Sequence, residues 1–184
     1  MTVLDVNEVI LVRRAYRALG HVEIPDTLVQ TLAESIQLTP SCFNNQPWRF
    51  VFVRSTNLLN ELHSALSKNN QWVEAASLIV AVYSRKDLDC VLPGREYYLF
   101  DTGMATAFLI LRATELGLVA HPIAGYDEEK VKAILQLPAE MTVITLVIVG
   151  KHTTTISPLL TEKQANTESK RPVRKSIEEL VSVR

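Results

Sequence analysis

Three arginines, Arg13, Arg14 and Arg17, lie close together near the amino terminus. If a helix ends here, each cation would stabilise it by about 0.3 to 1 kcal/mol through the helix dipole. The guanidinium groups also repel one another, and the nearest carboxylates, Glu8 and Glu23, are too few to neutralise them. Guanidinium groups pair with phosphate oxygens in a bidentate manner, so a bound phosphate would relieve that repulsion. The cluster therefore predicts a phosphate site, beside the simpler helix-end explanation.

A second basic group lies near the carboxyl terminus, where Arg171 and Arg174 belong to the run Lys170–Lys175. A solvated run of charges is the simple explanation of such a group. The sharper hypothesis is that these residues contact the same phosphate as the first cluster.

Amide and hydroxyl side chains are dense between Thr39 and Trp48. These residue types are common in turns between a helix and a strand. Asn and Gln each offer a donor and an acceptor, which suits the uracil-like edge of a flavin, with its two carbonyls and one N–H. Pro47 is expected to push Gln46 towards an extended backbone. The candidate ligand residues in this segment are Pro40, Ser41, Cys42, Asn44 and Gln46.

The stretch from Gly117 to Asp127 predicts the end of one helix and the capped start of the next. Between them Ala124 and Gly125 leave a backbone that a ligand could approach closely, because glycine has no Cβ. A backbone N–H there could donate to the reactive N5 of a flavin. His121, in the same stretch, is expected to have a structural role, as is Asp101 in the preceding helix.

Other familiar sites are missing from the sequence. The glycines form neither GxGxxG nor a Walker loop, and there is no GxSxG or HExxH. The net charge of -1 gives no general attraction to nucleic acid or to an anionic membrane. Apolar stretches are of strand length and too short to span a bilayer. The two cysteines are widely spaced, which predicts unpaired thiols and no metal site. Together with the absence of a signal-peptide pattern, this predicts a cytoplasmic location.

The elements that would position these residues follow from hydrophobic spacing, and they predict one α+β domain, a sandwich with a mixed sheet. Tyr97–Leu116 is apolar almost all round, so we expect it to be buried in a core or between subunits. After Gly150 the chain turns polar, which predicts a core at 1–150 and an extension at 151–184 that is disordered or wraps on something else. Helices are expected at 5–14, 26–39, 57–68, 97–116 and 127–136, and strands at 48–54, 77–83, 119–123 and 142–149.

Taken in order, the motifs RRAYR, PSCFNNQPWRFVFV, DTGMATAFLILRATELGL, HPIAGYD and RPVRKSIEELV resemble those of the nitroreductase family, whose members are FMN enzymes. The resemblance covers almost the whole chain. It implies a three-layer sandwich with a mostly antiparallel sheet, and an intertwined homodimer in which the tail packs on the partner subunit.

By that resemblance the FMN site has contributions from both subunits. The residues carried over are Arg13, Arg14, Ala15 and Arg17, then Pro40, Ser41, Cys42, Asn44 and Gln46 from the opposite subunit, Asn69 or its neighbour Asn70, Ile123, Ala124 and Gly125 along the flavin, and Arg171 and Arg174 at the phosphate. Ala15 stands where a serine is common in the family, and Ala124 where some members have an acidic residue.

The resemblance also implies an activity. NAD(P)H would reduce the flavin, which would then reduce a nitroaromatic, a quinone or a related acceptor by a ping-pong mechanism, with no catalytic side chain required. Three alternatives are reductive dehalogenation, oxygen-dependent flavin breakdown and a non-catalytic FMN-binding dimer.

Overall fold

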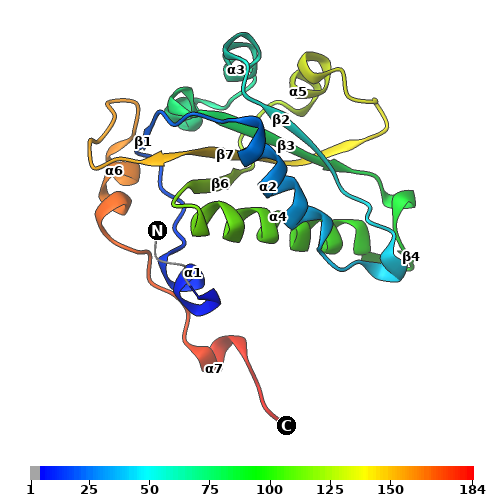
Figure 1. Ribbon diagram of the computed structural model, residues 1–184. Coiled ribbons are helices and arrows are strands. Elements are labelled where there is room, and N and C mark those ends of the chain that lie inside the picture. Colours follow the sequence, from blue (N-terminus) through cyan, green and yellow to red (C-terminus); the bar gives the residue numbers. More distant parts are fainter. Residues whose placement is uncertain (1–4) are drawn as a thin grey trace.

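A computed structural model describes residues 5–184 (Figure 1). Within that range the main sheet has five strands, and every strand pair is antiparallel. The long strand β7 (Thr142–His152) is central: β3 (Leu78–Ser84) pairs along one of its edges and β6 (Val119–Ile123) along the other, while β1 (Leu19–Gly20) pairs with its last two residues. β2 (Arg49–Val53) adds to the outer edge of β3.

Helices cover both faces of this sheet (Figure 1). The strand β3 shows why, since its side chains alternate: Val80 and Val82 belong to the core under α2 (Asp26–Gln37) and α4 (Tyr97–Glu115), whereas Ile79 and Ala81 belong to the core under α3 (Thr56–His63) and α5 (Glu128–Leu135). These two cores confirm the predicted α+β three-layer sandwich. The remaining elements are α1 (Val6–Val12), η1 (Cys42–Asn44), η2 (Lys68–Ala75), η3 (Lys86–Leu88), β4 (Val91–Leu92), β5 (Arg95–Glu96), α6 (Glu162–Ser169) and α7 (Ile177–Leu180).

The first helix begins where the sequence predicts. The Asp5 carboxylate accepts from Glu8 N at 2.8 Å while the Glu8 carboxylate accepts from Asp5 N at 2.9 Å, which forms a capping box. The helix ends at Val12, and Arg13 has a ψ of 122°. The arginine cluster therefore lies on the irregular segment that follows the helix.

The helix predicted at 57–68 is shorter than expected, because α3 ends at His63. Beyond it the backbone pairs with a distant segment: Asp127 N donates to Ala65 O at 2.7 Å, and Ser67 N donates to Gly125 O at 3.0 Å. The Ala65 carbonyl and the Ser67 amide therefore bond to a distant segment and not to a further turn of the helix.

The helix α4 buries one side only. Asp101, Thr106 and Leu109 are buried, whereas Phe100 and Phe108 remain exposed in the single chain. Apolar residues of α1 are exposed as well. Despite its apolar character, neither α4 nor any other helix of residues 5–184 is long and apolar enough to cross a membrane.

The boundary expected at residue 150 falls inside β7, which continues to His152 and pairs there with β1. In the extension, α6 packs on its own chain, and Glu168 is buried. Beyond it α7 points away from the body (Figure 1), and Val173, Ile177 and Leu180 are exposed. The tail therefore has two parts, one docked on its own subunit and one extended.

The prediction that the two cysteines are unpaired is wrong. Cys42 and Cys90 form a disulfide with their Cα atoms 6.1 Å apart, within the usual range of about 4.4 to 6.8 Å. They are 48 residues apart in the sequence, and spacing along a chain does not reveal which loops meet in space. The cysteine content consequently no longer supports a reducing compartment.

Candidate functional site

The two arginine groups meet in one cavity of about 260 Å³ between the segment after α1 and the tail after α6. Burial and the nearby charges of Arg171 and Arg174 lower the pKa of Arg13. Such a concentration of positive charge favours an anionic ligand. The lining residues are Arg13, Arg14, Ala15, Arg17, Thr167, Arg171, Pro172 and Arg174, and none of them is a carboxylate.

The arginines of this cavity divide into two groups. Arg14 donates to Thr167 O at 2.8 Å and lies over the Tyr16 ring, while Arg171 donates to the carbonyls of Leu11 and Arg13. These two guanidinium groups join the amino-terminal segment to the tail. The other three arginines are Arg13, Arg17 and Arg174. Within residues 5–184 their side chains donate no hydrogen bond.

Glu168, which the sequence analysis did not single out, holds the segment in place. Its buried carboxylate accepts from Arg17 N at 3.0 Å and from Ala18 N at 3.1 Å. A buried carboxylate that receives two backbone donors fixes the path of the chain through the arginine cluster. No sequence signal marked this residue, because it lies 150 positions away from Ala18.

His121 supports the same segment from the sheet. Its Nδ1 lies 3.0 Å from the Tyr16 carbonyl, which can only accept, so Nδ1 carries the proton. The ring packs against Trp72 at 4.8 Å between centroids. Burial, followed by the charges of Arg17 and Arg13, lowers the pKa of His121 to about 4, although the hydrogen bond to Tyr16 opposes this. The expected structural role of His121 agrees with this geometry.

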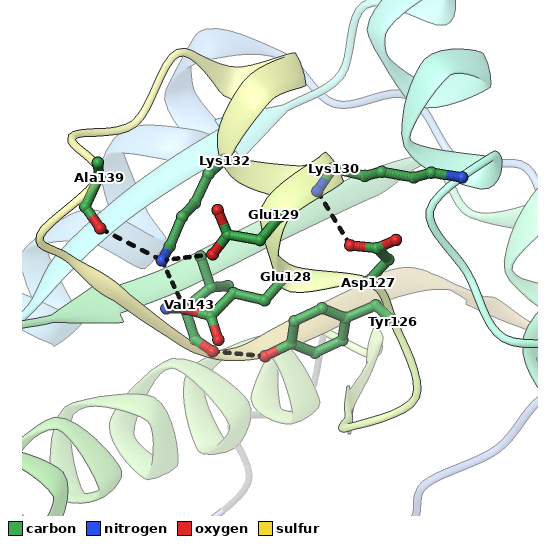
Figure 2. Close-up of polar contacts among 8 residues, drawn as sticks. All are labelled: Tyr126, Asp127, Glu128, Glu129, Lys130, Lys132, Ala139 and Val143. Carbon is green, nitrogen blue, oxygen red and sulfur yellow. Dashed lines mark hydrogen bonds and ion pairs between the residues drawn. The ribbon is translucent and has the colours of Figure 1, made fainter.

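The segment 123–127 is anchored to β7 (Figure 2). Tyr126 donates from its hydroxyl to Val143 O at 2.7 Å, and Val143 N donates to Glu128 at 3.0 Å. Burial raises the pKa of Tyr126 to about 12, so this hydroxyl keeps its proton. The Asp127 carboxylate accepts from Lys130 N at 3.1 Å and caps α5. Gly125 is thereby held between a fixed strand and a fixed helix.

Gly125 is a glycine because its neighbours leave no space. A Cβ there would lie 2.5 Å from Ser67 Oγ and 2.7 Å from Asn70 Nδ2. Its carbonyl accepts from Ser67 N and, at 2.9 Å, from Asn70 Nδ2. Its own N–H donates no hydrogen bond within residues 5–184. Ile123 beside it is buried, and Ala124 is exposed.

The structure distinguishes the two asparagines that the sequence left open. Asn70 is occupied, since its amide donates to Gly125 O and accepts from Trp72 Nε1 at 3.3 Å. Asn69 is exposed and lines a second cavity of about 390 Å³ together with Arg17. Asn69 is accordingly the asparagine whose side chain faces open space near the arginines.

The amide-rich loop that holds Pro40, Ser41, Cys42, Asn44 and Gln46 lies elsewhere. Cys42 N donates to Asp101 in the first turns of α4, whereas α1 lies beside Phe108 and Glu115 near the other end of that helix. A helix rises about 1.5 Å per residue, so the loop and the arginine cavity are separated along α4 (Figure 1). The chain alone does not bring these two groups of predicted residues together.

The backbone of this loop also differs from the expectation for Gln46. The φ angle of Gln46 is 49°, in the left-handed region, and the φ angles of Phe43 and Asn44 lie in the same region. Ser41 Oγ accepts from Gln46 N at 2.9 Å, and the Gln46 amide turns back to Asn44. These local hydrogen bonds outweigh the preference that the following proline imposes.

Known proteins match this chain over most of its length. The model of the nitroreductase family matches residues 10–89 and 63–151. The chain belongs to the nitroreductase family. A Stutzerimonas stutzeri relative with the provisional name NADH dehydrogenase/NAD(P)H nitroreductase is 33% identical over an alignment of 129 residues. The match covers 60% of this chain and 66%, just under two thirds, of that protein. A Thermus thermophilus protein named NADH dehydrogenase is 26% identical over 181 residues, covering 82% of this chain and 88% of the relative.

A solved structure extends the likeness to the whole fold. A protein from Exiguobacterium sibiricum, determined in complex with FMN, superposes with a TM-score of 0.81 over 100% of this chain and 99% of that one. The two sequences are 22% identical, so the likeness shows a shared fold. The family resemblance inferred from the motifs is confirmed.

Proposed function

We propose that this nitroreductase-family chain is an FMN-dependent oxidoreductase that takes electrons from NAD(P)H and passes them to nitroaromatic, quinone or related acceptors. The arginine cavity carries the proposal, because both ends of the chain build it and no carboxylate of the described residues lines it. The names of the relatives and the FMN complex of the structural neighbour support the same assignment.

The residues present fit a flavin mononucleotide. Arg13, Arg17 and Arg174 offer guanidinium donors that no other group of residues 5–184 uses, which suits a phosphate. Gly125 offers a backbone N–H that no acceptor of residues 5–184 uses, which suits an acceptor atom of the ring. Asn69 offers an exposed amide for the polar edge of that ring.

When bound, FMN would supply the hydride and electron chemistry. The chain would bind the phosphate, orient the ring through Gly125 and place positive charge from Arg17 near its polar edge. NAD(P)H and the acceptor would use the exposed face of the bound ring in turn, which favours ping-pong kinetics.

We also propose that the functional unit is a homodimer. The amide-rich loop and the arginine cavity are apart within one chain, so a second copy would have to supply the loop for one complete site. Apolar surface suited to such contact is exposed on α1, on α4 at Phe108, and on the tail at Val173 and Ile177. Light scattering that gives the mass of a monomer at working concentrations would contradict this.

The test of the cofactor assignment is FMN affinity in three variants. Arg13→Ala and Arg174→Ala each remove a charge-assisted donor, so each should weaken FMN binding by about 10- to 100-fold, which corresponds to about 1.5 to 3 kcal/mol. Arg54→Ala is the matched control, because it removes the same charge at a surface ion pair with Asp26. Quenching of FMN fluorescence gives the affinities, and bleaching of the bound flavin by NADH tests the activity. Equal FMN affinity in all three variants would contradict the proposal.

A further inference from the structure

The disulfide between Cys42 and Cys90 lies outside the arginine cavity and joins two segments that are far apart in the sequence. Cys42 belongs to η1 in the amide-rich loop, and Cys90 follows η3 on the way to β4. Both residues are half-buried, and partial exposure is typical of cysteines that react with small reagents. The bond fastens the loop to the segment that precedes α4.

Hydrogen bonds hold these two segments together in addition to the covalent bond. The Asp101 carboxylate, on α4, accepts from Cys42 N at 2.7 Å. The Asn45 amide donates to Asp89 Oδ1 at 3.3 Å and lies 3.7 Å from Cys90 Sγ. Because these contacts do not depend on the S–S bond, the sulfur atoms should remain neighbours after the bond is reduced.

A pair of buried carboxyl groups lies beside the sulfur atoms. Asp89 and Asp101 are both buried, and within the described residues Asp89 Oδ2 has no hydrogen-bond partner. Burial raises the pKa of Asp101, the hydrogen bond from Cys42 N opposes this, and the nearby charge of Asp89 raises the pKa further. A carboxylate oxygen of Asp89 and both sulfur atoms lie within 4.8 Å of one another.

We propose that Cys42 and Cys90 form a reversible thiol–disulfide site that reacts with small thiols of the glutathione class. In the reductive direction, a thiolate of the reductant attacks one sulfur, forms a mixed disulfide and releases the other cysteine as a thiolate. A second thiol of the reductant then attacks the mixed disulfide and releases the first cysteine. Two thiols are oxidised to one small-molecule disulfide, the protein disulfide is reduced, and the two protons end on Cys42 and Cys90.

The arrangement favours reversibility over a purely permanent crosslink. The chain contains two cysteines in all, so no third thiol can divert the exchange. A carboxylate oxygen of Asp89 lies within 4.8 Å of both sulfur atoms, so either thiol would have a hydrogen-bond acceptor beside it after reduction. Reduction would leave the loop held by the hydrogen bonds of Asp101 and Asn45 alone, and its backbone should then open more readily.

Counting thiols in the full protein tests the chemistry. Denaturing alkylation followed by mass spectrometry should find no modified cysteine after equilibration with oxidised glutathione and two after equilibration with reduced glutathione. Intermediate ratios should give a continuous and reversible titration. Cys42→Ser and Cys90→Ser are the controls, and each should show one thiol that can be alkylated after full reduction but no intramolecular disulfide. Two free thiols under every oxidising condition would overturn the proposal, as would a disulfide that resists all glutathione ratios in the folded protein.

Hydrogen exchange provides the second measurement. The amides of residues 41–46 should exchange roughly tenfold faster in the reduced protein, and Cys90→Ser should show the same faster exchange without any reductant. Identical exchange in the oxidised and reduced proteins would refute the tethering role. Stoichiometric zinc retained by the reduced protein would overturn the proposal in favour of a metal site, since two thiolates and a carboxylate are zinc ligands.

One consequence rests on the proposed function, namely that the tethered loop contributes to the FMN site of the other subunit. Reduction should then weaken FMN binding in the wild-type protein and leave it unchanged in Cys90→Ser. If FMN does not bind in either redox state, the proposed function fails while the thiol titration still tests the disulfide. If FMN binds equally well in both states, the link between the disulfide and the cofactor is refuted.

Discussion

His121 should make the stability of this protein depend on pH between 7 and 5. Its pKa is lowered from 6.5 to about 4 in the folded state, mainly by burial. As the pH falls below 6.5 the unfolded chain binds a proton at this position, while the folded chain does not until about pH 4. The stabilisation is therefore complete above pH 6.5 and is lost as the pH falls through the folded pKa. At about 1.4 kcal/mol per pH unit the full loss is about 3 kcal/mol, and the part between pH 7 and pH 5 is about 2 kcal/mol.

The matched variant is His121→Asn, whose amide can still donate to the Tyr16 carbonyl but does not titrate. Urea unfolding followed by tryptophan fluorescence reports on the site directly, because the buried Trp72 packs against His121. The free energy of unfolding is compared at pH 7, 6 and 5 at one protein concentration. Other titrating groups are common to both proteins and cancel in the difference. If the two proteins lose the same stability between pH 7 and pH 5, the assignment of a neutral buried His121 is refuted.

Two further substitutions test how the site is positioned. Glu168→Ala removes the acceptor of the backbone N–H groups of Arg17 and Ala18, so it should lower the free energy of unfolding by about 2 to 4 kcal/mol. Glu168→Gln keeps one carbonyl acceptor and should lower it less. Equal losses for the two variants in urea unfolding would contradict this role of Glu168. Gly125→Ala should cost about 1 to 3 kcal/mol through overpacking, because its Cβ would lie 2.5 Å from Ser67 Oγ. Adding Ser67→Ala should restore part of the melting temperature, and an unchanged melting temperature in Gly125→Ala alone would show that the space is adequate.

Local features of the site were predictable from the sequence. Asp5 and Asp127 mark helix starts because a carboxylate can satisfy free N–H groups one turn later. The strand β3 and the apolar helix α4 follow from the spacing of hydrophobic residues. The order of the arginine, amide and glycine motifs was sufficient to indicate the family, which the family match confirms.

Contacts between distant residues depended on the tertiary structure. The Cys42–Cys90 disulfide, the carboxylate of Glu168 under the arginine segment, and the shortened α3 all arise where segments far apart in the sequence meet. In each case a residue meets a covalent or hydrogen-bond partner that local spacing does not reveal.

The arginines show both kinds of information. The sequence alone determined that Arg13, Arg14 and Arg17 concentrate positive charge, and that a second basic group lies near the other end of the chain. Only the tertiary structure decided that the two groups share one cavity, and that Arg14 and Arg171 hold the chain together there. The physical reason is that charge density is a property of composition along the chain, whereas the division between structural and available guanidinium groups depends on which carbonyl groups the fold brings within reach.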